Sequence, residues 1–140
     1  NWYGFDDSLY NSARILRMVS ELKDETFGEM LDRMVPSLPT TGEVKVPCPE
    51  SDKDGVVAAV TKTLLEAGLN CSTVDGVRAR FLSDDGEYIG WYLCRRSNTE
   101  EVLVMRVEAI DEQSLEFVMQ QVHSLVSPHI GLDKLQDSLE

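Results

Sequence analysis

A short polar run with an arginine, two hydroxyls and an amide stands between two apolar stretches of this chain. The four side chains that could hold an anion are Arg95, Ser97, Asn98 and Thr99. A guanidinium offers an oxyanion a planar fork of N–H donors, and hydroxyl groups add further donors. An asparagine tolerates the tight backbone that aligns amide N–H groups around an anion. The run therefore predicts a compact phosphate site, and the plainer alternative is a polar hairpin loop with exposed arginines.

Other polar residues of the chain have structural explanations. An ion pair between neighbouring strands accounts for Arg106, and we interpret His123 and His129 as structural or exposed. Asp84 and Asp85 stand beside a single glycine and lack the ligand spacing of a calcium loop, so they predict a turn. With no nucleophile–base pair in the sequence, we predict no catalytic residue and no metal site in this chain.

Two predicted strands must position the polar run. Residues 88–94 and 102–109 are rich in β-branched and aromatic residues, and the intervening Ser, Asn and Thr favour a connecting loop. We predict that one face of each strand is apolar. These faces comprise Ile89, Trp91 and Leu93 in the first strand and Leu103, Met105, Val107 and Ala109 in the second.

The first part of the chain is predicted to be helical. Apolar residues recur at helical spacing over residues 7–22, and acidic residues precede them. Thr26 and Glu29 have the spacing of a capping box, which predicts a second helix through about Met34. Prolines and small residues over 36–42 indicate a linker.

From Glu43 onward the pattern favours a compact α+β domain. The predicted strands are 43–46, 71–74 and 77–81, with hairpin turns at Asp75-Gly76 and Asp84-Asp85-Gly86. A helix capped by Ser51 or Asp52 would carry Val56, Val57, Val60, Leu64 and Leu65 on its apolar face and end at Gly68. A final helix would begin at Asp111 and end at Pro128, and the tail after Ile130 is expected to fray. Two helices on one face of an antiparallel sheet of four or slightly more strands bury these stripes economically.

The composition of the chain argues against some kinds of binding partner and indicates a cellular compartment. The chain has 140 residues and a formal net charge of −12, which argues against nucleic acid or an anionic membrane as a partner. Three widely spaced cysteines have no zinc or redox spacing and indicate free thiols in a reducing, cytoplasmic compartment. The chain begins at Asn1 rather than Met, which we interpret as a fragment of a longer protein.

Four stretches, in order, resemble the α-D-phosphohexomutases of the phosphomannomutase/phosphoglucomutase type. The run LCRRSNTEEVLVMRVEA is similar to the family's C-terminal phosphate-binding segment, and Asp75-Gly76-Val77-Arg78 resembles the strand entry before it. The stretches YGFDD at Tyr3–Asp7 and EVKVPCP at Glu43–Pro49 resemble segments near the end of the third domain and the start of the fourth. Two positions depart from the family pattern: Arg96 replaces a small residue or proline, and Glu101 replaces a frequent proline.

The resemblance implies a TATA-binding-protein-like fold for residues 40–140, with residues 1–39 closing the preceding domain. It implies that Arg95, Ser97, Asn98 and Thr99 contact the phosphate of a hexose phosphate or hexose bisphosphate that is not being transferred. We expect Arg96 to point to solvent and Glu101 to leave the loop more mobile. Mg²⁺ and the phosphoserine would belong to other domains of the same polypeptide, so the isolated chain would be inactive. The alternatives are the equivalent domain of a phosphoglucosamine-type mutase, or a free-standing phosphate-binding or interaction module.

Overall fold

The computed structural model describes residues 7–35 and 37–130 of the chain. The chain divides into two compact units, Asn1–Ser37 and Leu38–Glu140. The Tyr3–Asp6 part of the family resemblance and the tail after Ile130 lie outside the described residues.

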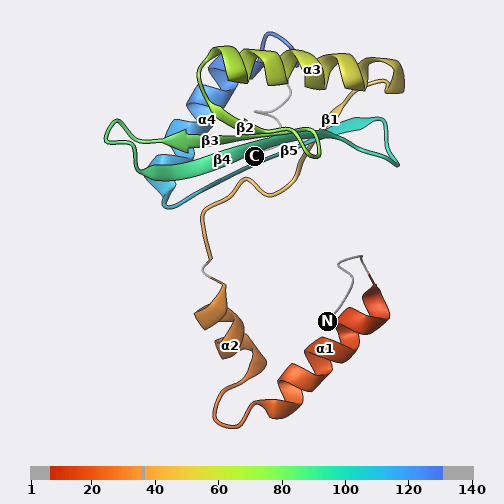
Figure 1. Cartoon of the computed structure of the whole chain (residues 1–140), viewed down its shortest axis with the longest axis vertical. Helices are drawn as coiled ribbons and strands as arrows, with labels where there is room; N and C mark the ends of the chain where they lie inside the picture. Colours follow the sequence, from red (N-terminus) through yellow and green to blue (C-terminus); the bar gives the residue numbers. More distant parts are fainter. Residues whose placement is uncertain (1–6, 36, 131–140) are drawn as a thin grey trace. The chain divides into compact units, whose positions relative to one another are not determined.

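Two helices form the described part of the first unit (Figure 1). Helix α1, Ser8–Glu21, begins where the Asp7 side chain accepts a hydrogen bond from the Tyr10 amide at 2.9 Å. Helix α2, Phe27–Met34, begins at Thr26 with both hydrogen bonds of the predicted capping box. Both predicted helices are confirmed, and no residue of α1 is buried.

The second unit is a five-stranded antiparallel sheet in the order β1-β5-β4-β3-β2. Its strands are β1 (Val44–Pro47), β2 (Asn70–Ser72), β3 (Val77–Leu82), β4 (Tyr88–Arg96) and β5 (Val102–Ala109). Helices α3 (Glu50–Glu66) and α4 (Glu112–Val126) lie on the same face of the sheet (Figure 1). The predicted α+β architecture is confirmed, with five strands in the sheet.

The core lies between this face of the sheet and the two helices. Its members include Val60 and Leu64 of α3, Val118 and Val126 of α4, and Val77, Ala79, Tyr92, Cys94, Met105 and Val107 of the sheet. Each buried residue removes apolar surface from water, and this burial is the main stabilising term for the unit.

The prediction for the apolar face of β4 is wrong. Gly90, Tyr92 and Cys94 are the buried residues of this strand, whereas Trp91 lies on the opposite, open face. The reason is register: Tyr92 pairs with Val107, a residue on the predicted and confirmed core face of β5. β4 is apolar on both faces, so alternation alone could not choose between them. The Tyr92 hydroxyl donates to Met105 Sδ at 3.2 Å, which lets a tyrosine occupy the core.

Helix α3 also begins earlier than predicted. Pro49 is its N-cap, no side chain caps the first turn, and Ser51 Oγ donates to the Asp52 carboxylate instead. The fixed φ of proline and two acidic residues in the first turn favour this start. Leu65 was predicted on the buried stripe but is 52% exposed, and Lys53 lies buried in the first turn. The helix ends at Glu66 with Ala67 as its C-cap, and the predicted Gly68 follows with a φ of +79°.

The three cysteines are free thiols. Burial raises the pKa of the Cys94 thiol to about 11 and also raises the pKa of Cys48 and Cys71 above the ordinary value. The thiols therefore stay protonated at neutral pH and are poor nucleophiles. Among the described residues, no helix is both long and apolar enough to cross a bilayer.

Candidate anion-binding site

The loop between β4 and β5 is organised by the hydroxyl of Ser97. Its Oγ accepts hydrogen bonds from the Thr99 amide at 3.4 Å and the Glu100 amide at 3.1 Å, and the Ser97 amide donates to the Val102 carbonyl at 3.0 Å. Ser97 is only 6% exposed. Because these bonds use the lone pairs of Oγ, the hydroxyl proton is still available for a ligand. Ser97 therefore shapes the loop and could also donate to an anion.

Two neutral polar side chains of the loop are exposed to solvent. Asn98 and Thr99 are exposed, and within residues 7–35 and 37–130 neither side chain makes a hydrogen bond. An amide and a hydroxyl that are not used to hold the loop are available to bind something else.

Arg95 is the arginine without a partner in the part of the chain that the structure describes. Its half-buried guanidinium makes no hydrogen bond, ion pair or ring contact there. The other arginines all have one: some pair with carboxylates, and others contact tyrosine or tryptophan. A guanidinium without a partner among the described residues, on the strand that leads into a loop with an exposed amide and hydroxyl, is chemically suited to an oxyanion.

Lys53 of helix α3 holds the backbone of the loop, a role that the sequence analysis did not predict. Its side chain is 1% exposed, and Nζ donates to the carbonyls of Ser97 at 3.0 Å and Glu100 at 2.5 Å and to the Glu50 carboxylate at 2.5 Å. All three ammonium donors are thus satisfied, which permits burial of the charge. A lysine in the first turn of a helix has no distinctive sequence signal. Only the fold brings the two loop carbonyls within hydrogen-bond distance of its ammonium group.

Arg96 was expected to point to solvent; its side chain is 41% exposed, but it also has carboxylate partners that the sequence did not predict. Its guanidinium pairs with Glu50 at 2.8 Å and Asp54 at 3.1 Å on helix α3. The even residues of β4 lie on the helix side of the sheet, which brings Arg96 within reach of the first turns of α3 at the protein surface. The hydrogen bond from Lys53, together with the charges of Lys53 and Arg96, lowers the pKa of the Glu50 carboxyl.

The predicted turn at Asp75-Gly76 packs directly behind Arg95. Gly76 has φ +69°, and a Cβ built on it would lie 2.3 Å from the Cys94 carbonyl oxygen and 2.7 Å from the Arg95 Cα. Any side chain at this position would push against the β4 backbone at Arg95. The Asp75-Gly76 turn and the start of the polar run at Arg95 are far apart along the chain but are therefore in contact in the fold.

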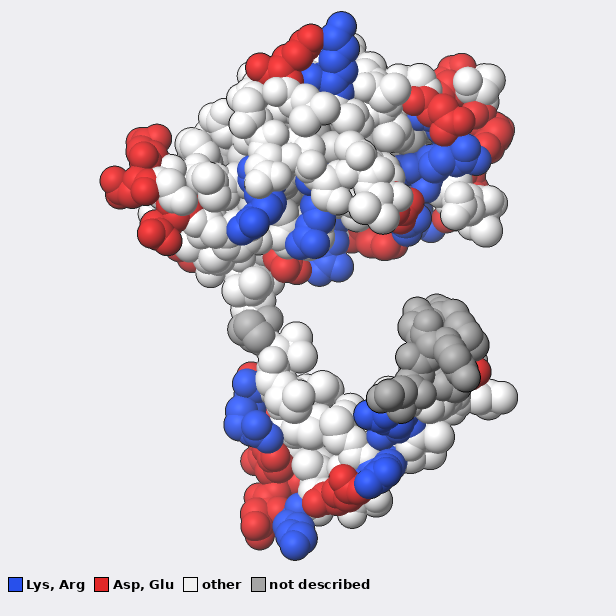
Figure 2. All heavy atoms as spheres, in the orientation of Figure 1, with Lys and Arg blue, Asp and Glu red and all other residues white. Residues whose placement is uncertain are grey.

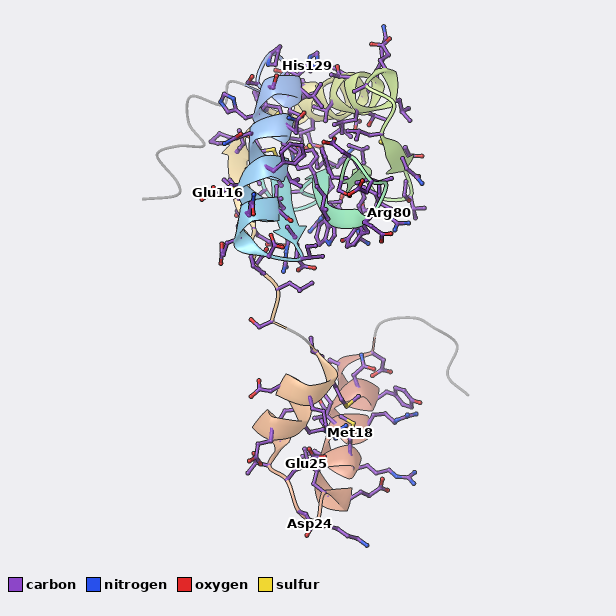
Figure 3. The ribbon with its side chains drawn as sticks, turned by 90° about the vertical axis from the view of Figure 1, so that its left-hand side faces the viewer. Met18, Asp24, Glu25, Arg80, Glu116 and His129 are labelled. Carbon is purple, nitrogen blue, oxygen red and sulfur yellow. The ribbon has the colours of Figure 1, made fainter. Side chains whose placement is uncertain are left out.

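The plainer explanations hold for the remaining candidates. Arg106 forms an ion pair with Glu108 at 3.1 Å, along β5 rather than between strands. His129 lies beyond the end of α4 (Figure 3), and its Nε2 is 2.7 Å from Thr63 Oγ1. His123 is exposed, and the Asp84-Asp85 stretch is a turn that closes on Gly86. Among the described residues no group of three or more potential ligands could hold a metal ion.

Comparison with known proteins identifies the family. The sequence model for the phosphoglucomutase/phosphomannomutase C-terminal domain matches residues 43–124. The chain belongs to this family. The phosphoglucomutase/phosphomannomutase match covers β4, β5 and α3 in full and α4 up to residue 124.

Individual phosphoglucomutase/phosphomannomutase relatives agree. The phosphomannomutase/phosphoglucomutase of Pseudomonas aeruginosa is 36% identical over 115 residues, which are 82% of this chain and 23% of that protein. A phosphoglucosamine mutase of Methanococcus vannielii is 35% identical over 122 residues, 86% of this chain and 25% of that protein. A crystal structure of a phosphoglucomutase/phosphomannomutase family protein from Burkholderia thailandensis superposes with a TM-score of 0.61 and 27% identity, over 91% of this chain and 25% of that one. The chain thus spans about a quarter of the length of these relatives.

Proposed function

We propose that this chain is the C-terminal domain of a phosphohexomutase and that its β4–β5 loop holds the phosphate that is not being transferred. The observation that supports this most directly is Arg95: among residues 7–35 and 37–130 its guanidinium has no partner, and the Asn98 and Thr99 side chains of the loop that follows make no hydrogen bond. Arg95, Ser97, Asn98 and Thr99 would contact the phosphate. The resemblance of the run LCRRSNTEEVLVMRVEA to the family's phosphate-binding segment supports this assignment.

Such a site would recognise the phosphate and not the sugar. A 1,6-phosphoryl transfer passes through a bisphosphate that must present either end to the same site. The oxygens of a phosphate look alike from both ends, and an arginine fork with hydroxyl donors makes no demand on the sugar. Holding the remote phosphate would keep the reacting hydroxyl near the phosphoserine, which converts binding energy into positioning.

The remaining chemistry would come from other domains of the same polypeptide. The family resemblance implies that the phosphoserine and the Mg²⁺ that assist transfer would be held there. This chain by itself would bind a hexose phosphate or bisphosphate without converting it.

The test is Arg95→Ala in the full-length enzyme. One charge-assisted contact is worth about 1.5–3 kcal/mol, so kcat/KM should fall roughly tenfold to a hundredfold or more. Lys62→Ala removes an exposed cation of α3 and is the control, which should leave kcat/KM unchanged. A nearly unchanged kcat/KM for Arg95→Ala would contradict the proposal.

Binding by the chain itself provides a second test. We expect inorganic phosphate or a hexose phosphate to shift the backbone amide resonances of Ser97, Asn98 and Thr99 in NMR spectra. The affinity should be weak, about millimolar, because the acidic chain opposes an anion and other domains complete the pocket. Unmoved loop resonances at saturating phosphate would place the anion site elsewhere.

A phosphoglucosamine-type mutase is the second candidate for the parent enzyme. The identity to the Methanococcus vannielii phosphoglucosamine mutase is similar to that of the other relatives. The coding sequence upstream of Asn1 decides among these readings. A phosphoserine loop, a metal loop and a sugar-selecting loop there would define the mutase, and a start codon just before Asn1 would favour the free-standing module.

A further inference from the structure

The face of the sheet away from α3 and α4 carries a second group of cations, which have no carboxylate partner in the part of the chain that the structure describes. In Figure 2, basic side chains gather on this side of the second unit, and Figure 3 labels Arg80 there. A depression of about 370 Å³ on this face is lined by Asn70, Ser72, Arg78, Arg80, Tyr88 and Trp91. None of these residues belongs to the β4–β5 loop.

Both arginines of the depression are held by aromatic rings. The Arg78 guanidinium carbon lies 4.3 Å from the ring centroid of Trp91, and that of Arg80 lies 5.2 Å from the centroid of Tyr88. Stacking on a ring occupies one face of a guanidinium and leaves the N–H groups at its edge free to donate. The rings therefore fix the orientation of both groups before any ligand arrives.

Neither arginine has a carboxylate partner among the described residues. The acidic residue that pairs with Trp91 in register, Glu108, is already engaged: its carboxylate accepts from Trp91 Nε1 at 3.2 Å and from Arg106 at 3.1 Å. The chain has a net charge of −12, yet no carboxylate of residues 7–35 and 37–130 pairs with these two cations. Two uncompensated positive charges repel one another unless an anion joins them.

Strand register completes the donor set. Arg80 pairs with Asn70 and Arg78 pairs with Ser72, so an amide and a hydroxyl flank the two guanidinium groups on the edge strand. Residues two apart on a strand are about 7 Å apart, a separation at which two arginine side chains can converge on the oxygens of one phosphate.

We propose that this depression binds a small phosphate-bearing molecule, at a site separate from the β4–β5 loop. Its volume falls within the range of small-molecule pockets and suits a ligand the size of a sugar phosphate. The charge comes from Arg78 and Arg80, the neutral donors from Asn70 and Ser72, and the rings of Tyr88 and Trp91 hold the cations in place.

Tryptophan fluorescence of the 140-residue chain tests the site, since Trp91 forms part of it. The titrations use the variant Trp2→Phe with Arg95→Gln, which leaves Trp91 as the single tryptophan and weakens the loop site. The probes are inorganic phosphate, a hexose phosphate and acetate, each at constant ionic strength. We expect a saturable change with both phosphates at millimolar concentration and a weaker response to acetate.

Arg78→Gln and Arg80→Gln should each weaken phosphate binding about tenfold or more, because each removes a charge-assisted contact. Lys62→Gln is the matched control on α3 and should leave the affinity unchanged. The amide resonances of Asn70 and Ser72 provide a readout independent of the tryptophan, and far-UV circular dichroism confirms folding of each variant. No saturable response, an equal response to acetate, or undiminished binding in the Arg78→Gln, Arg80→Gln double variant would overturn the proposal.

Discussion

The two ends of strand β4 are held in different ways. At its start, the Ser83–Glu87 turn closes on itself: the Ser83 amide donates to the Glu87 carbonyl at 2.8 Å and the Gly86 amide to the Ser83 carbonyl at 2.9 Å. At its end, the β4–β5 loop is also held from outside. Lys53 bonds two of its carbonyls, and the Cys48 amide donates to the Glu101 carbonyl at 2.9 Å.

The difference follows from what each connection leaves unused. A tight turn satisfies its own backbone and needs only a glycine with positive φ, here Gly86 at +83°. The β4–β5 loop leaves the side chains of Asn98 and Thr99 free, so other elements must fix its backbone. A loop fixed in advance loses less entropy when a ligand binds, which increases affinity.

Replacing Lys53 should give the largest effect. Lys53→Met leaves the Ser97 and Glu100 carbonyls without their donor and should lower the free energy of unfolding by about 3 kcal/mol. Urea denaturation measures the change. The rate of amide hydrogen exchange should increase more in the β4–β5 loop than in the Ser83–Glu87 turn. Lys62→Met, at an exposed lysine of the same helix, should stay within about 0.5 kcal/mol. An equal loss of unfolding free energy in Lys53→Met and Lys62→Met would show that the loop does not depend on Lys53.

The two glycine turns should respond unequally to alanine. Gly76→Ala combines a left-handed backbone with a clash against β4 and should cost about 2–3 kcal/mol of unfolding free energy. Gly86→Ala meets nothing within 4 Å and should cost only about 1 kcal/mol for its backbone conformation. Thermal and urea unfolding of both variants measure the difference, and a larger loss at Gly86 would contradict the packing of Gly76 behind Arg95.

Acid should weaken the supported loop more than the self-closed turn. The pKa of Glu50 is lowered from its ordinary 4.5 by the hydrogen bond from Lys53. The stability that this pair contributes is therefore present above about pH 4.5 and is lost as pH falls through the lower folded-state pKa. Between pH 7 and pH 3, Glu50→Gln should lose less unfolding free energy than the parent chain. If the free energy of unfolding of Glu50→Gln and of the parent chain fell equally with pH, the Glu50–Lys53 pair would not be an acid-sensitive support of the loop.

Proline at position 101 should produce the smallest effect. Glu101→Pro keeps the carbonyl that accepts from Cys48, and no described residue other than glycine has a positive φ. Restricting the unfolded chain should raise the free energy of unfolding by about 0.5 kcal/mol and slow hydrogen exchange in the loop. A loss of stability would mean that the native backbone at Glu101 is incompatible with proline.

Local signals in the sequence were sufficient for the elements that depend on neighbours along the chain. The capping box at Thr26, the cap at Asp111 and the glycine turns form from residues within a few positions of one another, so their patterns predicted them correctly. The polar run from Arg95 to Thr99 was likewise found from its composition, and the family to which it belongs was identified from the residues around it.

Only the tertiary structure decided which face of β4 is buried, where Arg96 goes and what supports the β4–β5 loop. β4 is apolar on both faces, and pairing with β5 selects Tyr92 for the core. Lys53 becomes a loop support because the sheet places two carbonyls, 44 and 47 residues away along the chain, over the first turn of α3. Contacts over such separations depend on the packing of whole elements, which no local pattern of residue types encodes.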